Sequence, residues 1–276
     1  MNKAVKGFTL IELIMVIVIV GIMATMTTDI ITLPVKSYID LERRTTLVDT
    51  AEISLRRMQR DIRRALPNSI RITGGTSLEL LHTSAGGRYR AKLASDGSGD
   101  ILDFTGAEAS VTNKSFDVIG DLSEEATGSL VIYNLDSSST GTALDPNAYD
   151  GDNRAVIDSS SPSNTIDKIV LTTAKVFPFS SPQQRFFIVD TPITYSCFNN
   201  ELRRYDNSID AGYVIGGSTT GLNYKLQAKA VILSCAFSYD EGTATRGGLV
   251  TVAITLTDEA GESAKLIHQV HVDNMP

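Results

Sequence analysis

The stretch KGFTLIE at residues 6–12, continued by LIMVIVIVGIMATMTT over residues 13–28, decides the fold of this 276-residue chain. No side chain from residue 13 to residue 28 is charged. With residues 8–11 in front, the run supplies about 20 residues, enough for a helix to cross a hydrocarbon core of roughly 30 Å. Lys3 and Lys6 precede the run, which by the positive-inside rule keeps that end cytoplasmic and exports the chain beyond about residue 30. The sequence therefore predicts one transmembrane helix over residues 8–30.

A secretory signal peptide is the alternative interpretation of this segment. Residues 21–26, GIMATM, imitate a small-residue cleavage site only weakly. The apolar run is long for a signal core and leads directly into a second helical pattern. We therefore expect the helix to remain in the mature protein.

One residue does not suit a plain membrane anchor. Glu12 lies four residues into the apolar run, where an unpaired carboxylate costs roughly 2.5 to 3.5 kcal/mol at membrane depth. A buried charge is tolerable when it has a partner of opposite sign. The alternative is a sporadic glutamate near the membrane interface.

Residues 6–12, with Gly7, Phe8 and Glu12 in this order, resemble the signal of type IV prepilins and type II secretion pseudopilins. The resemblance implies that a prepilin peptidase cuts between Gly7 and Phe8, methylates the new amine of Phe8 and removes residues 1–7 as a leader. It implies that Glu12 pairs with the Phe8 amine of its own chain or of a neighbouring subunit in a fibre. It further implies a single-pass inner-membrane protein with its carboxy-terminal domain in the periplasm.

A second helical pattern follows the apolar run. Residues 31–66 are expected to be amphipathic, because apolar residues recur at spacings of three and four. Pro67 stops the pattern, so residues 8–66 are expected to form one helix of about 90 Å, with bends at Gly21 and Pro34. Its second half needs a soluble partner, and a sheet is the obvious one. The apolar stripe consists of Val48, Ala51, Leu55, Met58, Ile62 and Ala65.

An arginine run lies largely off that stripe. Either it is a solvated helix face with pairs such as Glu52 to Arg56, or it is a contact surface for acidic neighbours in an assembly. The solvated face is the preferred interpretation. The run comprises Arg56, Arg57, Arg60, Arg63 and Arg64.

Residues 67–276 are expected to form a β-rich domain. The clearest signal is a terminal hairpin, in which residues 250–257 alternate, residues 258–262 turn, and residues 266–272 return with Leu266, His268, Val270 and Val272 facing the core. The predicted fold class is α+β and pilin-like, with a long helix packed on antiparallel sheet. The other expected strands are 70–73, 77–81, 101–104, 129–134, 166–176 and 185–189, with a hairpin at 194–198 and 201–205 around Asn199 and Asn200.

A polar stretch over residues 136–164 is expected to be a long surface loop. Asp145, Asn147, Asp150 and Asp152 offer oxygen ligands of the kind that Ca²⁺ prefers, but their spacing misses the EF-hand pattern. A solvated turn is the preferred interpretation, and no metal is expected.

Cys197 and Cys235 are the two cysteines of the chain. In an exported domain an even pair is most simply a disulfide, worth up to roughly 4 kcal/mol by loop entropy. Two buried, unpaired thiols on separate strands are the alternative.

The sequence contains no recognisable catalytic motif. It lacks a G-x-S-x-G elbow, and the glycine-rich residues 216–221 lack the lysine of a phosphate-binding loop. His268 and His271 point to opposite faces of a strand, so they do not form a metal pair. With 25 Lys and Arg against 32 Asp and Glu, the net charge of −7 argues against nucleic acid as the main partner. We expect neither an enzyme nor a cofactor.

Residues 131–135, 148–156 and 266–274 resemble minor pilins of the mannose-sensitive haemagglutinin (MSHA) pilus. More distantly, the chain is similar to the J-type minor pseudopilins of type II secretion. The resemblance implies other minor and major pilins and the inner-membrane assembly machinery as partners, and a role in fibre initiation. Because the outermost subunit of these systems lacks the residue seen here as Glu12, a place just below the tip is implied. The alternative of another class is a membrane-tethered periplasmic binding or adhesion module.

Overall fold

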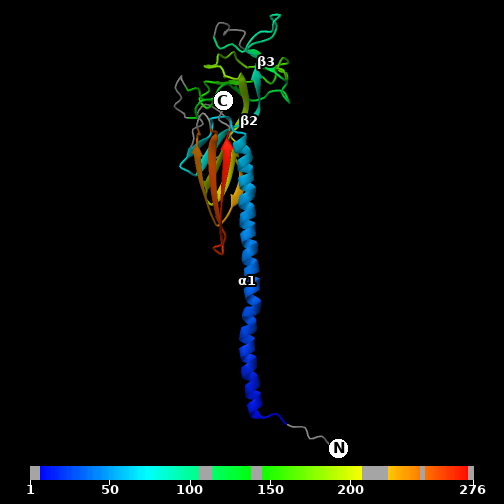
Figure 1. Ribbon diagram of the computed structural model, residues 1–276, viewed down its shortest axis with the longest axis vertical. Helices are drawn as coiled ribbons and strands as arrows, with labels where there is room; N and C mark the ends of the chain where they lie inside the picture. The colour runs from blue at the N-terminus through cyan, green and yellow to red at the C-terminus, as the bar shows by residue number, and fades with distance from the viewer. Residues whose placement is uncertain (1–6, 106–113, 138–144, 207–222, 243–245, 273–276) are drawn as a thin grey trace, which may run out of the picture.

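The computed structural model describes residues 7–105, 114–137, 145–206, 223–242 and 246–272. A single long helix, α1 (Leu10–Arg63), runs along the β domain and extends far beyond it toward the amino terminus (Figure 1). Its 54 residues correspond to about 80 Å at 1.5 Å per residue. The predicted helix over 8–66 is thus confirmed, with ends two and three residues further in. Gly21 and Pro34 lie inside the uninterrupted helix, and a bend at either one remains a prediction.

Two antiparallel sheets follow the helix. The nine-stranded sheet has the order β5-β4-β7-β2-β3-β6, with β1 paired to β2, β8 paired to β7, and β9 paired to β8. The three-stranded sheet has the order β10-β11-β12. The bounds are β1 (Arg71–Thr73), β2 (Ser77–Tyr89), β3 (Ser115–Ile119), β4 (Ser129–Val131), β5 (Arg154–Val156), β6 (Lys168–Val170), β7 (Arg185–Phe198), β8 (Glu201–Asp206), β9 (Tyr224–Lys229), β10 (Ile232–Asp240), β11 (Gly248–Thr257) and β12 (Ser263–Val272).

The second half of α1 supplies one wall of a core that both sheets complete. The predicted stripe is confirmed, because Ala51, Met58 and Ile62 are fully buried against residues of β7, β8, β10 and β11. Apolar packing on this core begins at Leu47, and before it Arg43 and Arg44 reach only the turn of the terminal hairpin. Much of the amphipathic segment predicted at 31–66 therefore lies outside the core and is exposed. Ser54 continues the contact, since its Oγ donates to the Gln227 carbonyl at 2.9 Å. The helix therefore cannot be removed without exposing the core.

A second core lies beyond the carboxy end of the helix. It is built around Phe116, Phe177 and Phe186, with Tyr89 at the end of β2. In Figure 1 the green strands and loops that contain it stand past the end of α1. The domain therefore consists of a helix-associated core and a distal lobe.

Strands β2 and β7 belong to both cores. Their ladder runs from Ser77↔Ser196 at one end to Arg88↔Arg185 at the other, with register shifts at Leu81 and Thr83. Sequence analysis predicted separate strands on either side of Pro192. The strand continues because β7 changes its outer neighbour there, from β4 at residues 187–189 to β8 at residues 193–198. A proline without an N–H is tolerated where the ladder on that side is already interrupted.

Several predicted strands are wrong in extent or existence. Strand β2 continues to Tyr89, well beyond the predicted 77–81. Residues 101–104 form no strand; Leu102 is buried, but the Asp103 side chain accepts from the Thr105 N–H and turns the chain. Strand β4 stops at Val131, since Tyr133 has a φ of 50°. The run predicted at 166–176 is a strand only over Lys168–Val170, where β3 offers a ladder of three residue pairs.

The stretch 136–164 is not wholly a surface loop. Residues 138–144 lie outside the described part, but β5 lies within the remainder, and Asn147, Asn153 and Asn164 are buried. Asn134 on the preceding segment accepts from the Ala148 N–H at 2.8 Å and donates to the Pro67 carbonyl at 2.9 Å. Buried amides therefore fasten this stretch to the end of the helix.

The terminal hairpin and the disulfide are confirmed. Val250, Val252 and Ile254 of β11 are buried, and β12 pairs with them in register through Leu266↔Ile254. Cys197 and Cys235 are bonded, with Cα atoms 6.1 Å apart. Because Cys197 lies on β7 and Cys235 on β10, the bond ties the two sheets together.

A buried ion pair lies beside the helix-associated core. Arg71 Nη2 and Glu79 Oε1 are 3.5 Å apart, and their side chains are 6% and 4% exposed. The Arg71 guanidinium lies over the ring of Tyr149, 3.2 Å from its centroid. Burial raises the pKa of Glu79 to about 7, against the opposing effects of Arg71 and Tyr149.

This pair predicts that the free energy of unfolding falls as the pH rises from about 5 to about 7.5. The folded state holds the Glu79 proton through a window in which the unfolded state, with a pKa near 4.5, has lost it. The effect is at most about 3 kcal/mol at 1.36 kcal/mol per pH unit. Urea unfolding of the wild type and Glu79→Gln at several pH values measures it. The variant should match the wild type near pH 5 and exceed it near pH 8; parallel curves would contradict the prediction.

Candidate processing and assembly site

The predicted cleavage site lies just before the helix. Gly7, Phe8 and Thr9 are not helical, and the Phe8 side chain is 78% exposed. No described atom lies within 4 Å of a Cβ built on Gly7, and its φ is not positive. The fold itself therefore does not require glycine at this position. A requirement for it would have to come from the enzyme that cuts the chain.

Thr9 and Glu12 form a reciprocal cap at the start of α1. The Thr9 N–H donates to Glu12 Oε2 at 3.2 Å, and the Glu12 N–H donates to Thr9 Oγ1 at 3.4 Å. The Thr9 hydroxyl also donates to Glu12 Oε2 at 3.1 Å. This is a capping box, in which a threonine and a glutamate three residues later satisfy two backbone donors of the first turn.

The cap explains how Glu12 is placed before any partner arrives. Its carboxylate faces the amino end of the helix, where the macrodipole favours negative charge. In the uncleaved chain the Phe8 nitrogen belongs to the peptide bond with Gly7, and Glu12 bonds to Thr9. Cleavage would create a positive amine on Phe8, one residue before the Thr9 N–H that already donates to Glu12. The pairing of Glu12 with the Phe8 amine remains a prediction.

None of the residues that the structure describes covers the first half of α1. Its most apolar window of 18 residues has a mean hydropathy of 2.5, and none of that window is buried. Side chains such as Ile17 and Val20 are more than half exposed. Within the described residues, α1 is the one helix long and apolar enough to cross a membrane. Its surface requires lipid or other helices.

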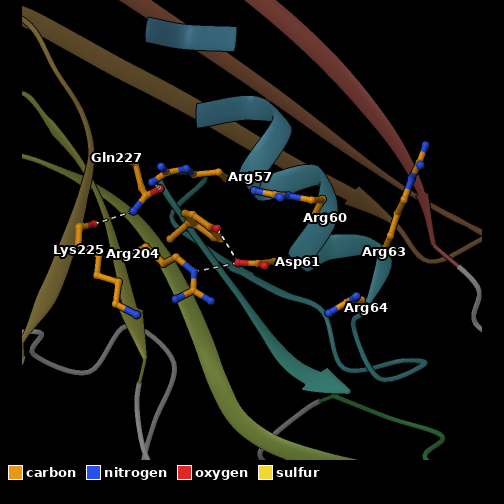
Figure 2. Close-up of a pocket in the computed structure, with 9 residues that line it drawn as sticks. Arg57, Arg60, Asp61, Arg63, Arg64, Arg204, Lys225 and Gln227 are labelled. Carbon is orange, nitrogen blue, oxygen red and sulfur yellow. Dashed lines mark hydrogen bonds and ion pairs between the residues drawn. The ribbon is translucent and has the colours of Figure 1, made fainter. Parts of the chain in front are cut away.

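A second feature is a basic pocket at the other end of the helix, with a volume of about 500 Å³. Figure 2 shows Arg57 and Arg60 of α1 on the side of Arg204, Lys225 and Gln227 of β8 and β9, with Arg63 pointing away from these strands. Tyr195 and Arg204 both hold Asp61, with Tyr195 Oη donating at 2.7 Å and Arg204 Nε at 2.8 Å. Burial and the neighbouring Asp61 carboxylate raise the pKa of Tyr195. The lining residues are Arg57, Arg60, Asp61, Arg63, Arg64, Tyr195, Arg204, Lys225 and Gln227.

Sequence reasoning found one wall of this pocket and missed the other. The predicted pair of Glu52 with Arg56 is confirmed at 2.6 Å, and Arg56 lies outside the pocket. Asp61 and Arg204 are 143 positions apart, and no local sequence pattern predicts their contact. The signal that could have been used is charge: Arg203 and Arg204 interrupt an otherwise alternating strand.

The calcium alternative receives no support from the geometry. Asn147 is buried, and its Oδ1 accepts from the Tyr149 N–H at 2.9 Å. Among the residues that the structure describes, no three His, Cys, Asp or Glu side chains gather as metal ligands. His268 is half-buried and His271 exposed, as expected for opposite faces of β12.

Comparison with known proteins gives one match. The family described as "Prokaryotic N-terminal methylation motif" matches residues 2–28, which include Gly7, Phe8 and Glu12. No curated protein and no solved structure matches the chain. Three features point to the same class of protein: the motif, the transmembrane-capable α1 and the antiparallel sheets that follow it. Together they support a membrane-anchored protein of the type IV pilin-like or pseudopilin class, processed by a prepilin peptidase.

Proposed function

We propose that the chain is a minor pilin that takes part in initiating and assembling a type IV pilus of the MSHA kind, corresponding to the subunit MshO. The observation that carries the proposal is the capped Glu12 at the start of a helix whose apolar half nothing in the described chain covers. The role is structural, and no enzyme activity is proposed. The partners are the prepilin peptidase, other minor and major pilins, and the inner-membrane assembly machinery.

The mechanism follows from the two halves of α1. The exposed apolar half packs beside other helices in the fibre, while Glu12 and the Phe8 amine set the stagger between neighbours. The half from Leu47 onward is bound to its own β domain and cannot serve as a general packing surface. The retention of Glu12 supports a place below the outermost tip subunit, with contacts on both sides.

The first test is the mature amino terminus. Mass spectrometry of the membrane-bound protein should find residues 8–276, beginning with N-methylated Phe8. Gly7→Leu should leave the uncut chain in the membrane, with at least a tenfold loss of the mature form. The space around Gly7 means that this loss would not come from misfolding. Thr76→Ala is a control with normal processing. An unchanged ratio of mature to uncut chain in Gly7→Leu would contradict the leader assignment.

The J-type minor pseudopilin of a type II secretion system is the second candidate, supported by the helix packed on antiparallel sheet. Deletion of the gene distinguishes the two. Loss of surface pili with normal protein secretion supports the pilus, and the reverse supports secretion. A tethered binding or adhesion module needs neither the cleavage site between Gly7 and Phe8 nor Glu12. Normal function of variants at these positions would therefore favour this third interpretation.

A further inference from the structure

We propose that the basic pocket between α1 and strands β8 and β9 receives an acidic segment of a neighbouring protein subunit, whose carboxylates pair with the arginines of the pocket. That the partner is another subunit of the same assembly rests on the proposed function. That the pocket binds carboxylates rests on the charge and shape of the pocket alone.

The pocket carries a large excess of positive charge for an acidic chain. Six of its lining residues are Arg or Lys, and Asp61 is the one acid among those described. Asp206 lies just outside the pocket and forms ion pairs with Arg204 and, at 2.7 Å, with Lys225. Asp61 and Asp206 therefore offset the positive charge of the two basic residues on the strands. Among the described residues, the arginines on the helix side have no comparable acidic partner.

The helix side consists of arginines for which the described part of the chain offers no acidic partner. Arg60, Arg63 and Arg64 are exposed and make no side-chain hydrogen bond or ion pair with the described residues. Arg57 bonds only weakly to Gln227, with its Nη1 at 3.4 Å from Oε1. Neighbours of like charge at spacings of three and four weaken a helix. The run therefore does not serve the stability of the isolated chain.

Paired arginines elsewhere on the same helix provide a comparison. Arg56 is 2.6 Å from Glu52, and Arg43 lies within 4.0 Å of both Asp40 and Asp258. Arg44 likewise lies 3.7 Å from Glu262 in the terminal hairpin. Among the described residues, the helix arginines outside the pocket thus have acidic partners, and Arg60, Arg63 and Arg64 of the pocket have none.

The dimensions favour a peptide over a single small anion. Arg57 and Arg64 are seven residues apart, about 10 Å along the helix axis, and Lys225 extends the pocket on the opposite wall. An extended acidic segment presents carboxylates on one face about 7 Å apart, so two or three successive carboxylates span this distance. Each guanidinium can take a carboxylate with two parallel hydrogen bonds.

The position on the helix excludes the headgroups of the membrane in which α1 is anchored. Arg57 lies about 70 Å along the axis from Leu10, of which the hydrocarbon core takes about 30 Å. The remaining distance is several Debye lengths at physiological salt, about 8 Å each. A protein at the same height is the partner that can reach the pocket.

The test uses the full chain in zwitterionic detergent and a fluorescent peptide of eight glutamates, with an eight-glutamine peptide for comparison. Fluorescence anisotropy should show binding of the acidic peptide that weakens at least tenfold in Arg60→Gln with Arg64→Gln. The matched control is Arg43→Gln with Arg56→Gln, which removes the same charge from arginines that are already paired. It should change the affinity less than twofold.

Three results would overturn the proposal. They are no binding of the acidic peptide, equal weakening in both double variants, or full displacement by a few millimolar inorganic phosphate, which would indicate a small-anion site. Far-ultraviolet circular dichroism of both variants checks that they fold. The assay does not depend on cleavage at Gly7 or on fibre assembly, so its failure and that of the proposed function are distinguishable.

Discussion

Glu12→Ala should leave cleavage between Gly7 and Phe8 intact and reduce the amount of mature chain in the fibre at least tenfold. In a membrane or fibre core the Phe8 amine of one chain and the carboxylate of another lose their hydration, and each then depends on the other. Alanine removes one partner and leaves the amine uncompensated, which is costly for a buried charge. Sheared pili and membranes, probed with the same antibody, give the two amounts.

The capping box makes a sharper variant available. A capping box accepts Gln as well as Glu at its third position, so Glu12→Gln keeps an oxygen that can accept from the Thr9 N–H and removes only the charge. If pairing with the amine sets the stagger, Gln should be nearly as defective as Ala. If the residue merely caps the helix, Gln should assemble normally. Glu42→Ala, at an exposed glutamate further along α1, is the control that should assemble like the wild type.

Ile62→Ala should lower the free energy of unfolding of the β domain by about 2 to 5 kcal/mol, the usual cost of truncating a fully buried isoleucine. Ile62 has no exposed surface and lies in the core that α1 shares with both sheets. The lost methyl groups leave a cavity because the disulfide and the β7 ladder hold the walls in place.

Ile53→Ala is the matched control, since Ile53 lies on the same helix with 55% of its side chain exposed. It should change stability by less than about 0.5 kcal/mol. Urea unfolding of both variants in detergent, followed by near-ultraviolet circular dichroism, provides the comparison. Equal losses would show that the helix does not pack on the sheets as the structure has it.

The parts of the fold that sequence could predict are those with a local period. The stripe from Ala51 to Ala65 repeats at helical spacing, and the residues from Val250 to Leu256 alternate, so each identifies its own buried face. Asn199 and Asn200, both at positive φ, mark a hairpin turn in the same local way.

The parts that sequence could not predict depend on distant partners. Residues 101–104 have the composition of a strand but do not pair with a neighbouring strand. Pro192, by contrast, is a residue that usually ends a strand, yet it lies within β7 opposite Leu81 of β2. The contact of Tyr195 and Arg204 with Asp61 joins three elements whose order in the chain says nothing of their neighbours. The leader could be predicted because seven adjacent residues carry its motif. The second wall of the pocket could not be predicted, because it comes from β8 and β9, which are far from α1 in the sequence.

The two long strands shared by both cores have a consequence for how the surface can vary. The chain from the end of β2 to the start of β7 forms most of the distal lobe and joins the rest of the domain through these two strands, through the bonds of Asn134 and Tyr149 to the segment after α1, and through a small cluster around Leu66 and Val131. Loops there can lengthen or change charge while the stripe on α1, the disulfide and the terminal hairpin stay as they are. Substitutions in the distal lobe are therefore expected to leave the packing of α1 on the helix-associated core unchanged, because the two cores share few buried side chains.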